Sequence, residues 1–238
     1  GTIARLARGN GHTRTICQID NVEPHEHHLT DKPFNRYSLH SVDGFVYMSE
    51  QVHSELRAYS DAPALFSPHP LFENFGERVE RSEACVRLGL DPANRYVLFF
   101  GLIRDYKGLD LLLDAWAQLR RAGRTEGRRL IVAGEFYTAR EPYLNRIADN
   151  GLQDEVLLHD RFIPDDDVKY YFSAADFVVQ PYKTATQSGV TQIAYQFCVP
   201  MVVTKVGGLA EIVPDGRVGY VCEPTPEGVA GAIERMYE

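Results

Sequence analysis

Strand-sized runs of β-forming residues alternate with segments of helical periodicity from about residue 80 to the end of the chain. We expect strands at 95–100, 129–133, 155–159, 176–180, 200–204 and 217–222. We expect helices at 80–88, 108–121, 139–149, 165–174, 188–197, 208–213 and from 226 onward. Strands that alternate with helices of this length predict an α/β protein with a doubly wound parallel sheet.

Residues 95–119 combine a buried strand, a cationic loop and an amphipathic helix. Residues 96–100 carry no charge, as expected of a strand that is covered on both faces. The loop that follows carries Arg104 and Lys107, and Gly108 leads into the helix. Ligands of open parallel sheets bind at the carboxyl ends of strands, so these two cations suit an anion such as a phosphate. The alternative is an ordinary surface loop with a solvated lysine.

Two further loops of the same predicted sheet have ligand-binding character. The loop at 184–190 contains small and polar residues and opens a helix, where an anion can approach free backbone N–H groups. Alternatively, Ser188 simply caps that helix. The loop at 206–216 contains Glu211, whose carboxylate could accept hydrogen bonds from ribose or sugar hydroxyls. Alternatively, it is a first-turn carboxylate that interacts favourably with the helix dipole.

The first third of the chain has a separate pattern. We expect strands at 14–20, 44–49 and 64–67, and helices at 33–42 and 50–58, the second capped by Ser49. The irregular stretch after residue 68 indicates a crossing between two domains, 1–75 and 76–238. Because the chain starts inside a basic amphipathic segment and ends in a helix, we expect it to be a piece of a longer polypeptide.

Composition excludes several classes of protein. A net charge of −8 argues against a nucleic-acid binder. No apolar run approaches the roughly 18 residues of a membrane span. The four cysteines are far apart and form no CxxC pair, which indicates reduced thiols and a cytoplasmic location instead of a disulfide framework or a zinc site.

A cluster of histidines and one glutamate, His25, Glu26, His27 and His28, could hold a metal ion. His25 and His28 have i, i+3 spacing, but they follow Pro24 in a polar loop and no partner ligands are evident elsewhere. A substrate-facing loop and a plain surface loop are the alternatives, and we favour the plain surface. No metal site is therefore predicted.

The motifs of the second part occur together in a known order. They are F-F-G-x-I-R-x-Y-K-G-L-D-L-L-L-x-A-W, V-A-G-E, F-I-P-x-x-x-V-x-x-Y-F-x-x-A-D-F-V-V-x-P-Y, T-Q-S-G-V and P-M-V-V-T-x-V-G-G-L-x-E-I-V. This set resembles the nucleotide-sugar domain of family 4 glycosyltransferases over about residues 90–238. Those enzymes are retaining and have the GT-B architecture of two Rossmann-like domains. Residues 1–80 resemble the last part of the family's first, acceptor-side domain, so that domain is expected to be incomplete here.

The resemblance implies roles for particular residues. Arg104 and Lys107, beyond the strand-end Gly101, match the catalytic cation pair that holds the donor diphosphate. The backbone around Phe162 and Ile163 matches the loop on which the nucleotide base rests. The remaining binding residues are Ser188, Gly189 and Val190 at the helix start that faces the distal phosphate, Gln187 beside them, and Glu211 in the G-G-x-x-E element.

Two positions depart from the family pattern. The family commonly has two glutamates around the helix at 188–197, and the corresponding places here are Ala185 and Ile193. Neither side chain can accept a hydrogen bond from a hydroxyl, and Gln187 is the nearest polar substitute. The usual diphosphate arginine directly follows the strand-end glycine, where this chain has Leu102 and places Arg104 two residues later.

The expected function is that of a retaining glycosyltransferase. The donor would be a nucleoside-diphosphate sugar, with UDP preferred to GDP, and the acceptor a glycan or a lipid-linked molecule. Neither a cofactor nor a metal is expected, the fragment alone is expected to be inactive, and peripheral membrane contact is expected only through a preceding region. The alternatives are a catalytically inactive nucleotide-sugar-binding module and, ranked last, a sugar-nucleotide epimerase, for which no acid or base is evident.

Overall fold

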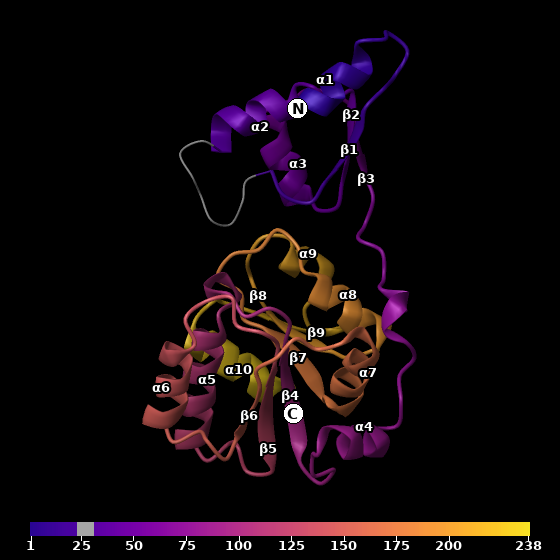
Figure 1. Ribbon diagram of the computed structural model, residues 1–238. Coiled ribbons are helices and arrows are strands. Elements are labelled where there is room, and N and C mark those ends of the chain that lie inside the picture. Colours follow the sequence, from indigo (N-terminus) through magenta and orange to yellow (C-terminus); the bar gives the residue numbers. More distant parts are fainter. Residues whose placement is uncertain (23–30) are drawn as a thin grey trace. The chain divides into compact units, whose positions relative to one another are not determined.

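The computed structural model describes residues 1–22 and 31–238, which divide into two compact units (Figure 1). The first unit comprises Gly1–Pro70 together with Ala185–Gln187, and the second comprises Leu71–Thr184 and Ser188–Glu238. The boundary expected from the sequence, between residues 75 and 76, lies a few residues further along the chain, at the end of the 3-10 turn η1 (Glu73–Phe75).

The first unit is built on a three-stranded parallel sheet of order β1-β2-β3. Its elements are α1 (Thr2–Arg8), β1 (Ile16–Ile19), α2 (Asp31–Leu39), β2 (Gly44–Tyr47), α3 (Glu50–Arg57) and β3 (Ala64–Phe66). Phe45 and Ile19 from the strands pack with Val52 and Leu56 of α3 in a small hydrophobic core. Ser49 accepts a hydrogen bond from the Val52 N–H, which confirms the predicted cap of α3.

Helix α1 was not predicted as a helix. It buries none of its side chains, and its N-cap residue Gly1 supplies no side-chain hydrogen bond. Arg5 attaches the helix instead, because its guanidinium donates to the Ser41 hydroxyl at 2.8 Å and lies 4.2 Å from the centre of the Tyr37 ring. Both partners are more than thirty residues away in the sequence, so the local pattern does not reveal them.

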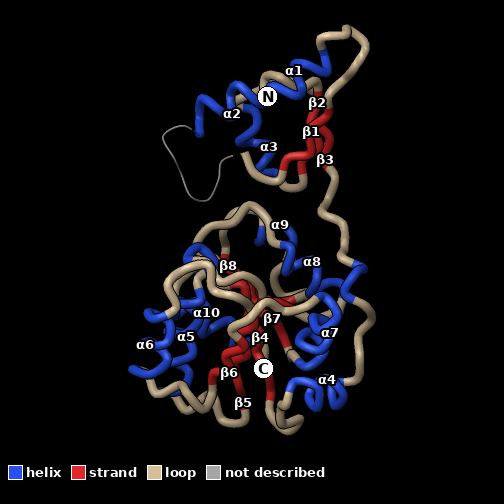
Figure 2. Tube along the Cα trace, in the orientation of Figure 1, coloured by secondary structure: helices blue, strands red, loops and turns tan. Residues whose placement is uncertain are grey.

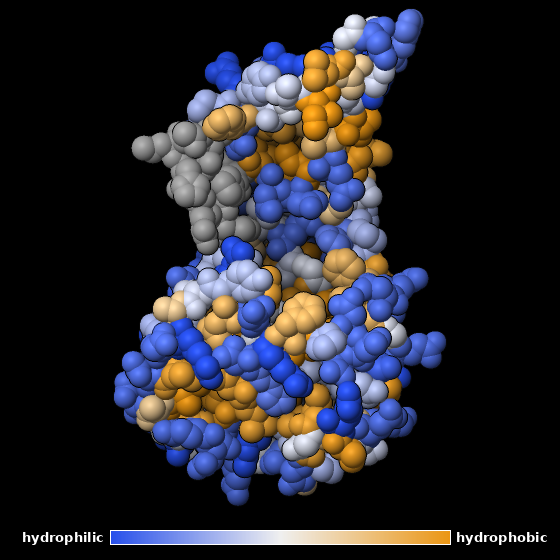
Figure 3. Space-filling model, viewed as in Figure 1, coloured by the Kyte–Doolittle hydropathy of each residue, from blue (hydrophilic) through white to orange (hydrophobic). Residues whose placement is uncertain are grey.

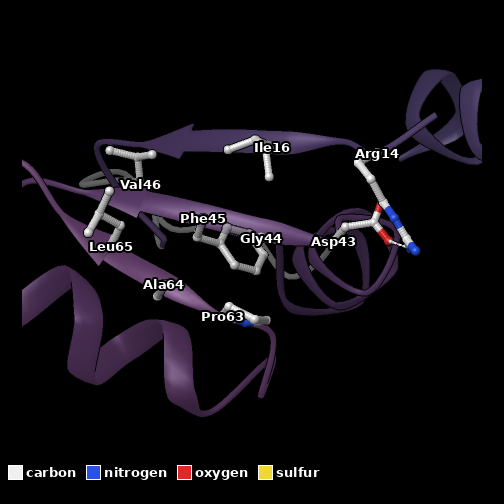
Figure 4. A pocket seen from close by; sticks show the side chains of 9 residues that line it. All are labelled: Arg14, Ile16, Asp43, Gly44, Phe45, Val46, Pro63, Ala64 and Leu65. Atoms are coloured by element: carbon white, nitrogen blue, oxygen red, sulfur yellow. Dashed lines mark hydrogen bonds and ion pairs between the residues drawn. The ribbon is translucent and has the colours of Figure 1, made fainter.

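One face of the three-stranded sheet carries an apolar hollow of about 500 Å³ (Figure 4). Ile16 and Leu65 line it and remain 65% and 67% exposed, and hydrophobic side chains are visible over this sheet in Figure 3. Its polar rim is formed by Asp43 and Arg14, whose side chains lie 3.5 Å apart. The hollow lacks convergent polar groups, so it does not have the character of a site for a charged ligand.

The second unit is built on a six-stranded, fully parallel sheet of order β6-β5-β4-β7-β8-β9 (Figure 2). The strands are β4 (Arg95–Phe100), β5 (Arg128–Ala133), β6 (Val156–His159), β7 (Phe177–Gln180), β8 (Met201–Thr204) and β9 (Gly219–Cys222). The other elements are η1, α4 (Arg81–Leu88), η2 (Asp105–Lys107), α5 (Leu109–Arg121), α6 (Glu141–Asp149), α7 (Asp165–Ala174), α8 (Gly189–Gln196), α9 (Leu209–Ile212) and α10 (Pro226–Arg235). The predicted alternation of strands and helices is confirmed.

Helices cover both faces of this sheet. α5, α6 and α10 lie together on one side, and α4 and α7 pack together on the other (Figure 1). Trp116 of α5 is fully buried in the core on the first side, and its indole N–H donates to Glu155 at 2.8 Å. The order of the strands reverses between β4 and β7, because β5 and β6 were added on one side of β4 and the later strands on the other. Open α/β sheets bind ligands at such a switch point, outside the carboxyl ends of the strands.

Several helix ends follow the sequence signals. Thr225 accepts a hydrogen bond from the Gly228 N–H at the start of α10, and Gly89 ends α4 in the left-handed conformation. Asp165 and the two aspartates after it lie in the first turn of α7, where they complement the helix dipole. In the part of the chain that the structure describes, no helix is long and apolar enough to cross a bilayer.

Candidate functional site

The carboxyl ends of β4 and β7 carry the two loops that form the candidate site. Gly108, between η2 and α5, has φ +69 and lies so close to Pro181, the residue after β7, that a Cβ at position 108 would overlap the Pro181 carbonyl oxygen. The two loops are also hydrogen bonded, since the Lys183 N–H donates to the Tyr106 carbonyl at 2.7 Å. This close approach brings Lys107 next to the segment that leads into α8.

Lys107 is buried, with an exposed fraction of 9%, so the alternative of a solvated surface lysine is wrong. Among the described residues it forms no ion pair with a carboxylate. Burial, together with the positive charge of Arg104, lowers its pKa from 10.5 to about 8. The ammonium would lie 3.1 Å from a Cβ placed on Gly101, so it sits directly over the end of β4. A buried cation without a carboxylate is a strong attractor for an anionic ligand.

Tyr182 connects Lys107 to the start of α8. Its ring centre lies 5.7 Å from the Lys107 ammonium, and its hydroxyl lies 3.1 Å from the Ser188 Oγ. Burial raises the pKa of the Tyr182 hydroxyl, which therefore stays protonated. No role was predicted for Tyr182. The signal that could have found it is its place two residues after the end of β7, at the predicted ligand edge.

Ser188 is the N-cap residue of α8, as the sequence suggested, but its side chain makes no capping hydrogen bond. It is buried, as is Val190, whose Cγ2 would lie 3.5 Å from a Cβ on Gly101. Gly189 is exposed at the first position of the helix. The structure thus brings Gly101, Lys107, Ser188 and Val190 together, although they come from loops more than eighty residues apart.

Arg104 precedes η2 and is partly exposed. Its guanidinium lies 5.3 Å from the centre of the Tyr137 ring. The Lys107 N–H donates to the Arg104 carbonyl at 3.0 Å, so the two cationic residues lie near each other, and the charge of Arg104 contributes to the lowered pKa of Lys107. They therefore form one positively charged edge at the end of β4.

A cavity of about 180 Å³ adjoins this edge and contains the other predicted residues of the β4 side. Its lining residues are Phe75, Phe100, Gly101, Leu102, Gly134, Glu135, Phe162, Ile163, Asp165 and Val168. Phe162 is 65% exposed and Ile163 is buried. The cavity is mainly apolar, is lined by three phenylalanine rings and includes Gly101, features that suit a flat heterocycle attached to a phosphate. No role was predicted for Phe75, in η1, or for Glu135, two residues after β5.

Two predicted residues lie elsewhere. Gln187 is grouped with the first unit by its contacts, so the structure does not assign it to the cluster at the end of β4. Glu211 lies exposed in α9, after β8, the strand next to β7. The two positions that depart from the family pattern, Ala185 and Ile193, are both buried apolar side chains.

The histidine cluster at 25–28 lies outside the described residues. Within the described ranges, 1–22 and 31–238, no group of three or more His, Cys, Asp or Glu side chains could hold a metal ion. Cys17, Cys85, Cys198 and Cys222 are free in the structure.

The family named Glycosyl transferases group 1 matches residues 94–238, which include β4, the cationic edge and α8. The chain belongs to this family. The D-inositol 3-phosphate glycosyltransferase of Pseudarthrobacter chlorophenolicus is 31% identical over 160 residues, 66% of this chain and 38% of that protein. The alpha-D-kanosaminyltransferase of Streptomyces kanamyceticus is 26% identical over 211 residues, 85% of this chain and 53% of that protein. The chain thus spans about a third to a half of these relatives.

Solved structures show the same fold. HepE of Anabaena in complex with UDP superposes with a TM-score of 0.82 at 18% identity, over 99% of this chain and 65% of that one. A sucrose-phosphate synthase from Thermosynechococcus elongatus gives a TM-score of 0.76 at 23% identity, over 89% of this chain and 53% of that one. The expected α/β architecture with two parallel sheets, of GT-B type, is therefore confirmed.

Proposed function

We propose that this chain carries the donor-binding part of a retaining glycosyltransferase that uses a nucleoside-diphosphate sugar, with UDP as the nucleotide. The observation that carries the proposal is Lys107, a buried ammonium at the switch point of the sheet with no carboxylate partner among the described residues. A diphosphate would supply the missing negative charge, and the cavity beside Gly101 would receive the base. The matched HepE structure, which contains UDP, supports this choice of nucleotide.

The charges at the end of β4 suit the departure of a diphosphate. In the proposed reaction the bond between the sugar C1 and the diphosphate oxygen breaks while C1 bonds to an acceptor hydroxyl oxygen on the same face. The hydroxyl proton passes to the leaving diphosphate. Lys107, Arg104 and the N-terminus of α8 would stabilise the negative charge that builds up on the departing phosphate. We propose a glycan or a lipid-linked molecule as the acceptor.

Nucleotide binding tests this proposal directly. UDP, GDP and ADP are added in turn to the chain while its melting temperature is measured. A ligand at one hundred times its Kd should stabilise the second unit by about 2.7 kcal/mol. UDP should produce the largest shift, and the absence of a shift with every nucleotide would contradict the proposal.

A second candidate function is nucleotide-sugar binding without transfer. Ala185 and Ile193, which stand where the family commonly has glutamates, favour it, because neither can bind a sugar hydroxyl. The two functions differ in turnover of the complete protein. UDP release from UDP-glucose that depends on an added acceptor supports the transferase, whereas UDP binding without release supports the binding module.

A further inference from the structure

Tyr182 occupies an unusual place in the candidate site, because it contacts both the cation and the helix start. It is 2% exposed, and its ring packs edge-on against Tyr106 at 6.0 Å between ring centres. The ring face turned to Lys107 and the hydroxyl paired with Ser188 leave Tyr182 little freedom to move. Its hydroxyl therefore determines where the Ser188 hydroxyl points.

The other hydroxyl-bearing N-cap residues of the described helices behave differently. Ser49 accepts a hydrogen bond from the Val52 N–H at 3.3 Å, and Thr225 accepts one from the Gly228 N–H at 3.1 Å. Ser188 makes no such bond, although its backbone (φ −145, ψ 123) is extended like that of Ser49 (φ −145, ψ 151). Backbone conformation thus does not prevent Ser188 from capping its helix. Two features distinguish Ser188. Its hydroxyl is paired with the Tyr182 hydroxyl, and the Thr191 N–H at the third helical position donates to the Ser188 carbonyl at 3.2 Å.

We propose that Tyr182 is a positioning residue whose hydroxyl holds the Ser188 hydroxyl away from the first turn of α8 and so keeps the Val190 N–H available to a phosphate. A capping serine takes up one N–H group at the second or third helical position. The Thr191 N–H at the third position already donates to the Ser188 carbonyl, so Val190 at the second position is the group that the Ser188 hydroxyl would take. Phosphates bind to the same N–H groups at a helix N-terminus. The inference rests on the proposed function, because it assigns Tyr182 a part in the same site.

The Tyr182→Phe variant tests the hydroxyl and keeps the ring against Lys107. Ser188 is then free to cap α8 and to compete with the phosphate. We expect UDP to bind about fivefold more weakly, the equivalent of one helix cap, while the melting temperature of the free protein is unchanged or higher. Tyr96→Phe is the matched control, because Tyr96 is equally buried and donates its hydroxyl to the Asp91 carbonyl at the other end of β4. It should leave the affinity for UDP unchanged.

The background of Ser188→Ala shows whether Tyr182 acts through Ser188. With no serine hydroxyl to divert, Tyr182→Phe should cause no further loss of affinity. In the free protein, the NMR amide signal of Val190 should shift in Tyr182→Phe and not in Tyr96→Phe. Equal losses in both backgrounds, or wild-type affinity in Tyr182→Phe, would overturn the inference alone. Failure of the wild-type chain to bind UDP would overturn the proposed function and this inference with it.

Discussion

At the scale of single residues, the buried charge of Lys107 should have opposite effects on folding and on the proposed binding of UDP. The lowering of its pKa from 10.5 to about 8 corresponds to on the order of 3 kcal/mol of cost for the charged form. Lys107→Met should therefore raise the melting temperature of the free protein and weaken UDP binding roughly tenfold to a hundredfold, the weight of a charged hydrogen bond. Lys169→Met is the matched control, since Lys169 also lies over a tyrosine ring but is partly exposed. A destabilised Lys107→Met variant with normal affinity would contradict this account.

The same residue predicts a pH dependence. Between about pH 8 and pH 10 the unfolded chain keeps a proton on Lys107 that the folded chain loses, so the free energy of unfolding should rise with pH. Affinity for UDP should fall over the same range, because the anion binds the protonated form. Denaturant titrations and UDP titrations at pH 7 to 10 measure the two trends. Both trends should be absent in Lys107→Met. If the free energy of unfolding or the UDP affinity of that variant still changes with pH as in the wild type, a group other than Lys107 is responsible.

At the scale of elements, the contact between the β4 loop and the end of β7 depends on Gly108. Gly108→Ala would place a Cβ against the Pro181 carbonyl and would keep an unfavourable positive φ, at a combined cost of about 3 kcal/mol. We expect lower stability and weaker UDP binding, because the two loops would move apart. Gly89→Ala is the matched control, because φ is +68 there and no atom lies within 4 Å of the added Cβ. It should cost only about 1–2 kcal/mol and leave UDP binding intact.

At the scale of the whole molecule, the two units have separate hydrophobic cores. Trp116 is the only tryptophan of the chain and lies in the second core, so its fluorescence reports on that unit. Leu56→Ala should destabilise the first unit by about 2–5 kcal/mol, as seen by far-ultraviolet circular dichroism. The fluorescence transition of Trp116, and its shift with UDP, should stay the same. Leu112→Ala should destabilise the second unit and shift the fluorescence transition of Trp116, while the first unit keeps its stability. If both transitions shift in parallel in either variant, the two cores unfold together and this prediction is wrong.

Local patterns in the sequence were sufficient to predict the strands, the helices and the sheet type. The charge-free run at 96–100, the cap at Ser49 and the start of α10 at Thr225 and Pro226 depend on neighbours within a few residues, so a single sequence contains their causes. Helix α1 was missed because its attachments, Tyr37 and Ser41, are distant in sequence.

The sequence by itself also determined which loops lie at the ligand edge, since parallel strands place all their carboxyl ends on one side. It could not decide that Lys107 is buried, that Tyr182 lies against it, or that the Ser188 hydroxyl leaves its cap position. Each depends on β7 adding beside β4, although residues 101–176 separate the two strands in sequence. Burial and the lowered pKa of Lys107 arise only when those two loops meet. The sequence specifies a lysine at position 107. Only the tertiary structure buries its ammonium group, and a buried positive charge favours the binding of an anion.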